Sequence, residues 1–318
     1  MFRKMQQSLL MTVAAAPLVL LFGCTTSGPT AAGLAASGTT FPVSVHAANG
    51  TVRIAAKPKA IVSLSPTATE MLYAMGAGSQ VKAVDQNSDY PHGVPTTSLD
   101  GNNPNTEAIA SYNPDLVVIS QDDSGLSNKL KALGITVLSD PAAVNLNQEY
   151  QQFEQLGEAT GHAAQARAQV ATITARIAQI VQSAPKATHS KSYYYELDQT
   201  FFSETSSTFI GQVLGLLGLK SIADTATGAA ASGGYPQLSG EFILKSNPDY
   251  IFLADTICCG QSPATVATRP GWSTLAAVKD SRVLGLSDDI ASRWGPRIVD
   301  LLQMVSDELK LHPSGTSS

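Results

Sequence analysis

Two glutamates stand at corresponding places in two similar stretches of the sequence. Glu107 precedes the turn Asn113-Pro114-Asp115 by six residues, and Glu241 precedes Asn247-Pro248-Asp249 by the same six. Each turn leads into a short run of β-branched, aliphatic or aromatic residues that is typical of a buried strand. The shared offset, turn and strand indicate an internal repeat. We therefore expect two similar halves, each of which presents one carboxylate.

Other side chains that could do chemistry form no recognisable catalytic or metal-binding pattern. The sequence contains no Gly-x-Ser-x-Gly motif and no glycine pattern for phosphates or dinucleotides. A zinc or manganese site needs histidines and carboxylates that converge, but the histidines are scattered, at positions 46, 92, 162, 189 and 312. We nominate no catalytic residue, metal ligand or cofactor. Because the sequence offers no residues for their chemistry, a zinc- or manganese-binding protein of an importer and a surface-anchored hydrolase are the weaker alternatives.

The N-terminus reads as an export signal. Arg3 and Lys4 precede an apolar run that ends at Leu21-Phe22-Gly23-Cys24, and a basic segment, an apolar segment and a small residue before the cleavage point are typical of a signal peptide. A cysteine after Leu-x-Gly resembles the bacterial lipobox, which implies diacylglycerol on Cys24. We expect residues 1–23 to be a signal peptide, 24–40 a lipid-anchored flexible tether, and the protein to lie outside the cytoplasm on the cell membrane.

The charge of the chain narrows its possible binding partners, and its cysteine content limits its possible disulfides. The chain has 25 acidic and 20 basic residues, a formal net charge of −5, and no basic block, so nucleic acid is not an expected partner. Beyond Cys24, only the adjacent Cys258 and Cys259 remain. A strained vicinal disulfide and two reduced thiols are both compatible with this spacing.

Hydrophobic patterns predict an α/β protein with two Rossmann-like lobes, one long linker helix and a ligand cleft between the lobes. Asn49-Gly50 predicts a β-hairpin turn, and Thr67 with Glu70 fits a helix capping box. Strands are expected at 60–64, 81–84, 116–119 and 135–138, and again at 192–197, 250–253 and 282–286. The predicted units are an N-terminal lobe (41–147), a helix of roughly 50 Å (148–183) and a C-terminal lobe (184–312).

Several ordered motifs resemble one family, the substrate-binding proteins of importers for ferric siderophores, haem and vitamin B12. The resemblance covers about residues 57–311 and is greatest to the members that bind vitamin B12. It depends on the strings at 60–70, 88–91 and 296–298, together with the two Glu and Asn-Pro-Asp repeats. It implies a monomer that captures a corrinoid or a ferric siderophore and delivers it to an ABC permease.

The resemblance also implies roles for individual residues. Glu107 and Glu241 would dock onto arginines of the permease, although each could instead merely stabilise the first turn of its helix. The expected ligand-binding residues come from four loops, and Leu99 would stand where the relatives have a cleft tryptophan. They are Tyr90, Leu99, Tyr235, Asp288, Asp289, Arg293 and Trp294. The alternative for Arg293 is an ion pair with Asp288 or Asp289.

Overall fold

The computed structural model describes residues 39–185 and 190–312. The expected signal peptide, the lipidation site Cys24 and nearly all of the expected tether therefore lie outside the described residues. Within the described part, no helix is both long enough and apolar enough to cross a membrane.

The described chain opens with the expected hairpin, which is attached to the first sheet. Strands β1 (Val43–Ala47) and β2 (Gly50–Ile54) pair antiparallel around a two-residue turn. The Asn49 side chain donates to the Val137 carbonyl oxygen at 3.0 Å and accepts from the Ser139 amide at 3.2 Å. The side-chain amide of Asn49 thus bonds the backbone of the neighbouring strand as a strand residue would, and it holds the hairpin at the edge of the sheet.

The first lobe, called the N lobe, is built on a four-stranded parallel sheet. Its strands are β3 (Ile61–Leu64), β4 (Val81–Val84), β5 (Leu116–Ile119) and β6 (Thr136–Ser139), in the order β4-β3-β5-β6. The strands β3 and β5 are buried throughout, as expected for a parallel sheet covered on both faces. The lobe also contains the hairpin and the helices α1 (Pro66–Ala74), α2 (Thr106–Ala110) and α3 (Leu126–Ala132).

The second lobe, called the C lobe, repeats this sheet. Its strands β7 (Lys191–Glu196), β8 (Leu219–Ser221), β9 (Tyr250–Leu253) and β10 (Val283–Gly285) are also parallel, in the order β10-β9-β7-β8. Numbered within each lobe, the two sheets therefore share the order 2-1-3-4. The helices of this lobe are α6 (Phe209–Gly215), α7 (Gly240–Ser246), α8 (Pro263–Ala267), α9 (Ala276–Lys279), α10 (Asp288–Ser292) and α11 (Ile298–Leu311).

The Asn-Pro-Asp turns have the same conformation and make the same kind of hydrogen bond in both lobes. Asn113 and Asn247 adopt positive φ angles of 49° and 43°, which asparagine tolerates better than most residues. The Asp115 carboxylate then accepts hydrogen bonds from the Lys59 and Ala60 amides ahead of β3, and Asp249 accepts one from the Ser192 amide in β7. Each turn thereby aligns the third strand of its sheet with the first, which confirms the predicted repeat.

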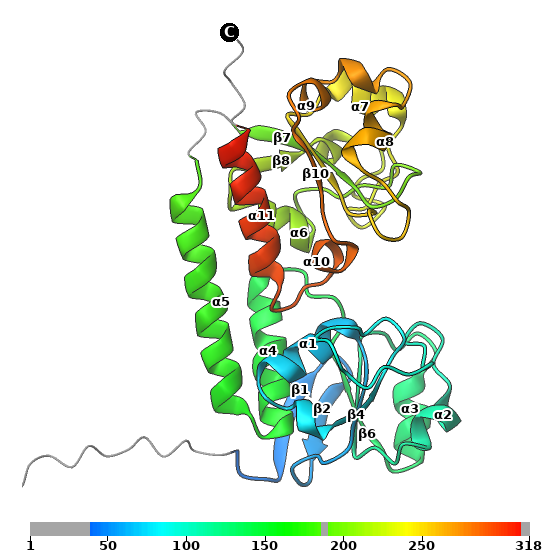
Figure 1. Ribbon diagram of the computed structural model, residues 1–318. Helices are drawn as coiled ribbons and strands as arrows, with labels where there is room; N and C mark the ends of the chain where they lie inside the picture. Colours follow the sequence, from blue (N-terminus) through cyan, green and yellow to red (C-terminus); the bar gives the residue numbers. More distant parts are fainter. Residues whose placement is uncertain (1–38, 186–189, 313–318) are drawn as a thin grey trace, which may run out of the picture. The chain divides into compact units, whose positions relative to one another are not determined.

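The prediction of one helix over 148–183 is wrong, because the chain turns back on itself. The structure has α4 (Leu146–Thr160) and α5 (Ala163–Ser183), which pack against each other (Figure 1). Gly161 ends α4 with φ +76°, a conformation in which glycine carries no steric penalty. A Cβ on Gly157 would lie 2.4 Å from the Ala166 Cβ, so this glycine allows the close approach. The 21-residue α5 spans about 30 Å at 1.5 Å per residue.

The largest apolar core joins the lobes along the side that carries α4, α5 and α11. It contains Phe153 and Leu156 of α4, Ile177 of α5, and Leu301 and Val305 of α11, all at most 7% exposed. The helices α4 and α1 contact each other, and so do α5 and α11. Two smaller cores fill the other face of each sheet. The lobes are therefore connected by apolar packing at one side, which leaves the opposite side open for a cleft.

Candidate functional site

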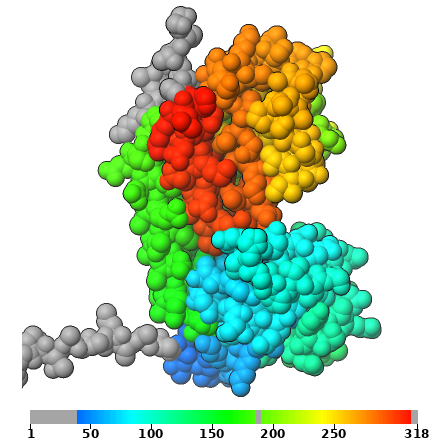
Figure 2. Space-filling model, in the orientation of Figure 1, coloured from blue at the N-terminus to red at the C-terminus, as the bar shows by residue number. Residues whose placement is uncertain are grey.

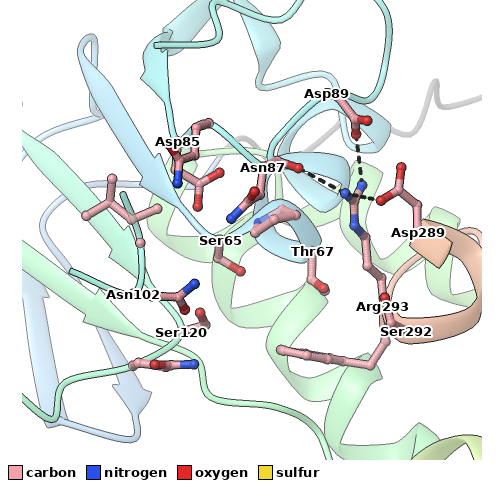
Figure 3. A pocket seen from close by; sticks show the side chains of 16 residues that line it. Ser65, Thr67, Asp85, Asn87, Asp89, Asn102, Ser120, Asp289, Ser292 and Arg293 are labelled. Atoms are coloured by element: carbon pink, nitrogen blue, oxygen red, sulfur yellow. Dashed lines mark hydrogen bonds and ion pairs between the residues drawn. The ribbon is translucent and has the colours of Figure 1, made fainter. Parts of the chain in front are cut away.

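A cavity of about 480 Å³ lies between the lobes (Figure 3). Its N-lobe wall consists mainly of the segments that follow β3, β4 and β5, and its C-lobe wall of α10 and the loop after it. Ligands of open α/β sheets bind outside the carboxyl ends of the strands, so the position is appropriate for a binding site. The space-filling view shows the surface notched between the two lobes (Figure 2). The lining includes Ser65, Thr67, Asp85, Asn87, Asp89, Asn102, Ser120, Gln121, Asp289, Ser292, Arg293 and Trp294.

A second hollow continues the cavity past Trp294. The two share Ser120, Gln121 and Trp294, and the second reaches Asn49 and Asp122 at the hairpin side of the N lobe. The Trp294 indole Nε1 donates to Gln152 Oε1 at 3.2 Å, while Gln152 Nε2 donates to the Pro141 carbonyl oxygen at 2.7 Å. These bonds fix the ring orientation, so Trp294 offers the cleft a positioned aromatic surface.

Arg293 connects the two walls of the cavity. Its Nη2 donates to Asp289 Oδ1 at 2.5 Å and to the Asn87 carbonyl oxygen at 2.9 Å, and its Nη1 donates to Glu70 Oε1 at 2.9 Å and Asp89 Oδ1 at 3.1 Å. Figure 3 shows Asp89 and Asp289 converging on the guanidinium. The fork geometry of an arginine allows several acceptors to be bound at once. Arg293 is therefore both a cavity residue and an ion-pair partner of Asp289.

Asp85 is a buried acceptor in the wall of the cavity. It directly follows β4, is 1% exposed, and its Oδ1 has no hydrogen-bond partner among the residues described. Burial raises the pKa of its carboxyl above the usual range. A Cβ on Gly101 would lie 2.8 Å from Asp85 Oδ2 and 2.7 Å from the Leu64 carbonyl oxygen. Gly101 thus permits its loop to close over Asp85, which leaves Oδ1 buried without a protein partner behind the cavity wall.

The charge of the cleft is negative. Asp85, Asp89 and Asp289 line the main cavity, and Asp122 and Asp123 line its continuation. Within the described chain, Arg293 is the one basic residue in either lining, and acidic side chains already bind it. The pKa of Asp89 is lowered although burial opposes this, because Arg293 bonds to it, whereas burial raises the pKa of Asp289. Such a cleft favours neutral or cationic ligands.

Glu70 does not have the capping role that its spacing from Thr67 predicts. Ser65 is the N-cap of α1, and its side chain accepts from the Ala68 amide at 3.2 Å. Glu70 is 2% exposed and binds Arg293 and Arg297 instead. The capping-box prediction is wrong because the helix begins at Pro66, one residue earlier than Thr67, so Glu70 points away from the cap and toward the C lobe.

The cavity brings together three of the residues proposed for ligand binding, namely Asp289, Arg293 and Trp294. Tyr90 adjoins them without lining the cavity, and the Arg297 guanidinium lies 4.2 Å from its ring centroid. Tyr235 is 45% exposed on the C lobe and is likewise absent from the lining.

Two of the predicted ligand-binding residues have structural surroundings instead. Leu99 is 6% exposed within an apolar core of the N lobe, so it provides no cleft wall. The Asp288 carboxylate accepts from the Ile257 and Cys258 amides at 2.9 and 2.7 Å. These bonds keep its pKa low despite burial. Its side chain secures the 256–258 loop and is absent from the cavity lining.

Sequence reasoning missed much of the N-lobe wall. Asp85, Ser65 and Ser120 directly follow predicted strands and line the cavity. The rule that ligands bind at carboxyl ends of parallel strands could have identified them. Nothing in the local sequence indicates that Arg297 pairs with Glu70, because 227 residues separate them.

Glu107 and Glu241 occupy equivalent positions. Each is exposed and is the second residue of a short helix, α2 or α7. The capping residues Asn105 and Ser239 accept from the third helical amide in both cases. In Figure 1 both helices lie on the side away from α5. The repeat thus places one exposed carboxylate on a short helix of each lobe.

Cys258 and Cys259 are free thiols, with Cys258 exposed and Cys259 half-buried. In the described part of the chain, no three histidine, cysteine, aspartate or glutamate side chains are close enough to hold a metal ion.

Two repeated α/β lobes, connected helices and an interlobe cavity define the class of two-lobed solute-binding proteins. The family described as "Periplasmic binding protein" matches residues 61–290, and the chain belongs to it. The chain is 32% identical over 279 residues to an "Uncharacterized ABC transporter substrate-binding lipoprotein YvrC" of Bacillus subtilis, covering 85% of this chain and 86% of that one. It is 28% identical over 270 residues to a "Cobalamin-binding protein" of Halobacterium salinarum, covering 82% and 72%.

A solved structure supports the same fold. A possible iron-binding (periplasmic solute-binding) protein from Staphylococcus epidermidis superposes with a TM-score of 0.68 and 27% identity. The match covers 80% of this chain and 99% of that one. The fold prediction of two α/β lobes is therefore confirmed.

Proposed function

We propose that this protein is the extracytoplasmic, lipid-anchored binding component of an ABC importer, and that it carries a corrinoid such as cobalamin. The cleft between the lobes binds the ligand, and Glu107 and Glu241 present the loaded protein to the permease. The names of the relatives, an ABC transporter substrate-binding lipoprotein and a cobalamin-binding protein, support binding rather than catalysis. The lipoprotein relative and the Leu21-Phe22-Gly23-Cys24 motif support anchoring through Cys24.

The charge of the cleft is the observation that favours a corrinoid. Ferric catecholates are polyanions and haem carries two propionates, so both would meet Asp85, Asp89 and Asp289 without a free arginine to compensate. Cobalamin is a near-neutral macrocycle with many peripheral amides. Aspartate, asparagine, glutamine and serine side chains can bond such amides in both directions.

The composition of the lining also disfavours haem. Haem iron in proteins takes histidine, cysteine, methionine or tyrosine as axial ligand. The described residues that line the two hollows include none of these types. Trp294 instead offers an aromatic surface against which the edge of a macrocycle can pack.

A ligand panel tests the proposal. Isothermal titration calorimetry with cyanocobalamin, a ferric tris-catecholate, a ferric hydroxamate and haemin should give saturable one-to-one binding for cyanocobalamin. Because a ligand that binds only the folded state raises its melting temperature, thermal shifts should rank the compounds in the same order. Tighter binding of the catecholate, the hydroxamate or haemin than of cyanocobalamin would refute the corrinoid assignment.

A further inference from the structure

A buried ion cluster joins the two lobes at the cleft. Glu70 lies on α1 of the N lobe, and its side chain is 1% exposed. Its Oε1 accepts from Arg293 Nη1 at 2.9 Å and Arg297 Nη2 at 2.6 Å, and its Oε2 accepts from Arg297 Nε at 2.9 Å. Both arginines come from the C-lobe segment between α10 and α11. Every hydrogen bond of this carboxylate to those arginines therefore crosses from one lobe to the other.

The rest of the cluster surrounds these bonds. Arg293 also binds the Asn87 carbonyl oxygen and Asp89 on the N lobe, and Asp289 on its own lobe. Arg297 stacks over the Tyr90 ring. The two arginine side chains are only 11% and 15% exposed. Loss of one carboxylate from such a cluster leaves buried guanidinium groups without their partner, which is costly.

The two arginines differ in their relation to the cavity. Arg293 lines it, whereas Arg297 does not. Arg297 bonds Glu70 through two nitrogens in the bidentate geometry that gives arginine–carboxylate pairs their directionality. Arg297 thereby fixes the Glu70 carboxylate, and Glu70 in turn fixes the Arg293 guanidinium at the cavity wall.

We propose that Glu70 is a positioning residue that sets the width of the unliganded cleft and the place of Arg293 within it. The role in ligand affinity rests on the corrinoid-binding function proposed above, but the role in joining the lobes does not. Apolar packing along α4, α5 and α11 holds the lobes at the opposite side. The ion cluster supplies the polar contact at the cleft itself, so the cleft is preformed before ligand arrives, which lowers the ordering cost of binding.

Substitution of Glu70 tests this role in the ligand-free protein. Glu70→Gln keeps the size of the side chain but turns an amide group toward the arginines. Hydrogen–deuterium exchange should become about tenfold faster at amides in 86–90 and 289–295, the scale expected for a lost charge-assisted bond. Glu196→Gln is the matched control, because Glu196 forms a buried bidentate pair with Arg269 within the C lobe. It should leave both segments unchanged.

Measurements of cyanocobalamin affinity separate the positioning role of Glu70 from the proposal that the protein binds a corrinoid. Glu70→Gln and Arg297→Gln should each weaken cyanocobalamin binding by about tenfold, whereas Glu196→Gln should not. Arg297→Gln serves as the second variant if Glu70→Gln does not fold. Unchanged exchange in both Glu70→Gln and Arg297→Gln would overturn the positioning role, as would equal exchange in Glu196→Gln. If the parent protein binds no cobalamin, the corrinoid proposal fails while the exchange data still decide how the lobes are joined.

Discussion

Arg293 shows how single side chains set the electrostatics of the cleft. Its guanidinium makes four hydrogen bonds, three of them to carboxylates. An arginine in this state has little capacity left to neutralise an anionic ligand. The aspartates in the lining, Asp85, Asp89 and Asp289, therefore leave the cavity acidic.

The first prediction, for Asp289, follows from this potential. Aquacobalamin carries one more positive charge than cyanocobalamin, so the parent protein should bind the aqua form more tightly. Asp289→Asn removes one negative charge from the cavity and should reduce that preference about two- to fivefold, equivalent to about 0.5–1 kcal/mol for a partly screened charge. Paired calorimetric titrations measure the ratio. Asp280→Asn, an exposed change at the residue that directly follows α9, is the control, and an equal effect of both variants would contradict the local explanation.

At the scale of elements, the sequence predicts the sheets well and the connection between them poorly. Buried apolar runs and the Asn-Pro-Asp turns are local signals, because each is recognised from a few neighbouring residues, even though Asp115 and Asp249 bond backbone amides 56 and 57 residues away in the same lobe. The helix break was signalled only by Gly157 and Gly161, whose weak helix propensity does not distinguish a tolerated glycine from a turn. The ion cluster has no local signal at all, since Glu70 meets residues more than 220 positions away.

The candidate site, too, was predictable only in part from the sequence. The loop with Asp289, Arg293 and Trp294, which the family resemblance nominates, lines the cavity. Leu99 does not, because a comparison of position along the sequence cannot distinguish a residue that faces the core from one that faces the cleft. Asp288 bonds the backbone of the 256–258 loop while Asp289 lines the cavity, because the side chains of adjacent residues point in different directions.

Two helical glycines give the second prediction. Gly157→Ala would place a Cβ 2.4 Å from the Ala166 Cβ, so it should destabilise the protein by about 1–3 kcal/mol through overpacking between α4 and α5. Gly215→Ala at the end of α6 meets open space and should be neutral or stabilising by up to about 1 kcal/mol. Urea unfolding of both variants gives the free energies of unfolding. Equal destabilisation by the two changes would contradict the helix-hairpin packing.

At the scale of the whole molecule, buried carboxyl groups make stability depend on pH. Burial raises the pKa of Asp140 to about 7 and that of Glu204 to about 8. In the unfolded chain both titrate near ~4. Between these pKa values the folded state therefore binds more protons than the unfolded chain. The contribution of these two groups to the free energy of unfolding is fully present below about pH 4, and it is lost as the pH rises toward 8.

The third prediction is that the melting temperature decreases between pH 5.5 and 8. Glu204→Gln should flatten this decrease, because the amide cannot ionise and can still accept the bond from the Thr208 hydroxyl. Scanning calorimetry at several pH values measures the slope. Glu158→Gln, at an exposed position of α4, should keep the parent slope, and a melting temperature that rises with pH would contradict the assignment.

The repeat gives the fourth prediction, which concerns both lobes together. Electrostatic contacts at an interface mainly set encounter and register, so reversal of Glu107 or Glu241 to arginine should reduce uptake by the cognate permease about tenfold or more. Both residues are exposed and absent from the cavity lining, so cyanocobalamin affinity should stay the same. Transport in vesicles that contain the permease, combined with titration of the free protein, separates the effects. Normal transport by both variants would remove the docking role.

The location of the bound cobalt tests the account most directly. Crystals grown with cyanocobalamin and measured at the cobalt absorption edge should show one anomalous difference peak between the lobes. We expect it between the N-lobe segments after β3, β4 and β5 and the side chain of Trp294. A peak elsewhere, for instance in the groove beside Trp272 and Glu241, or a crevice without cobalt at saturating ligand, would contradict the proposed function.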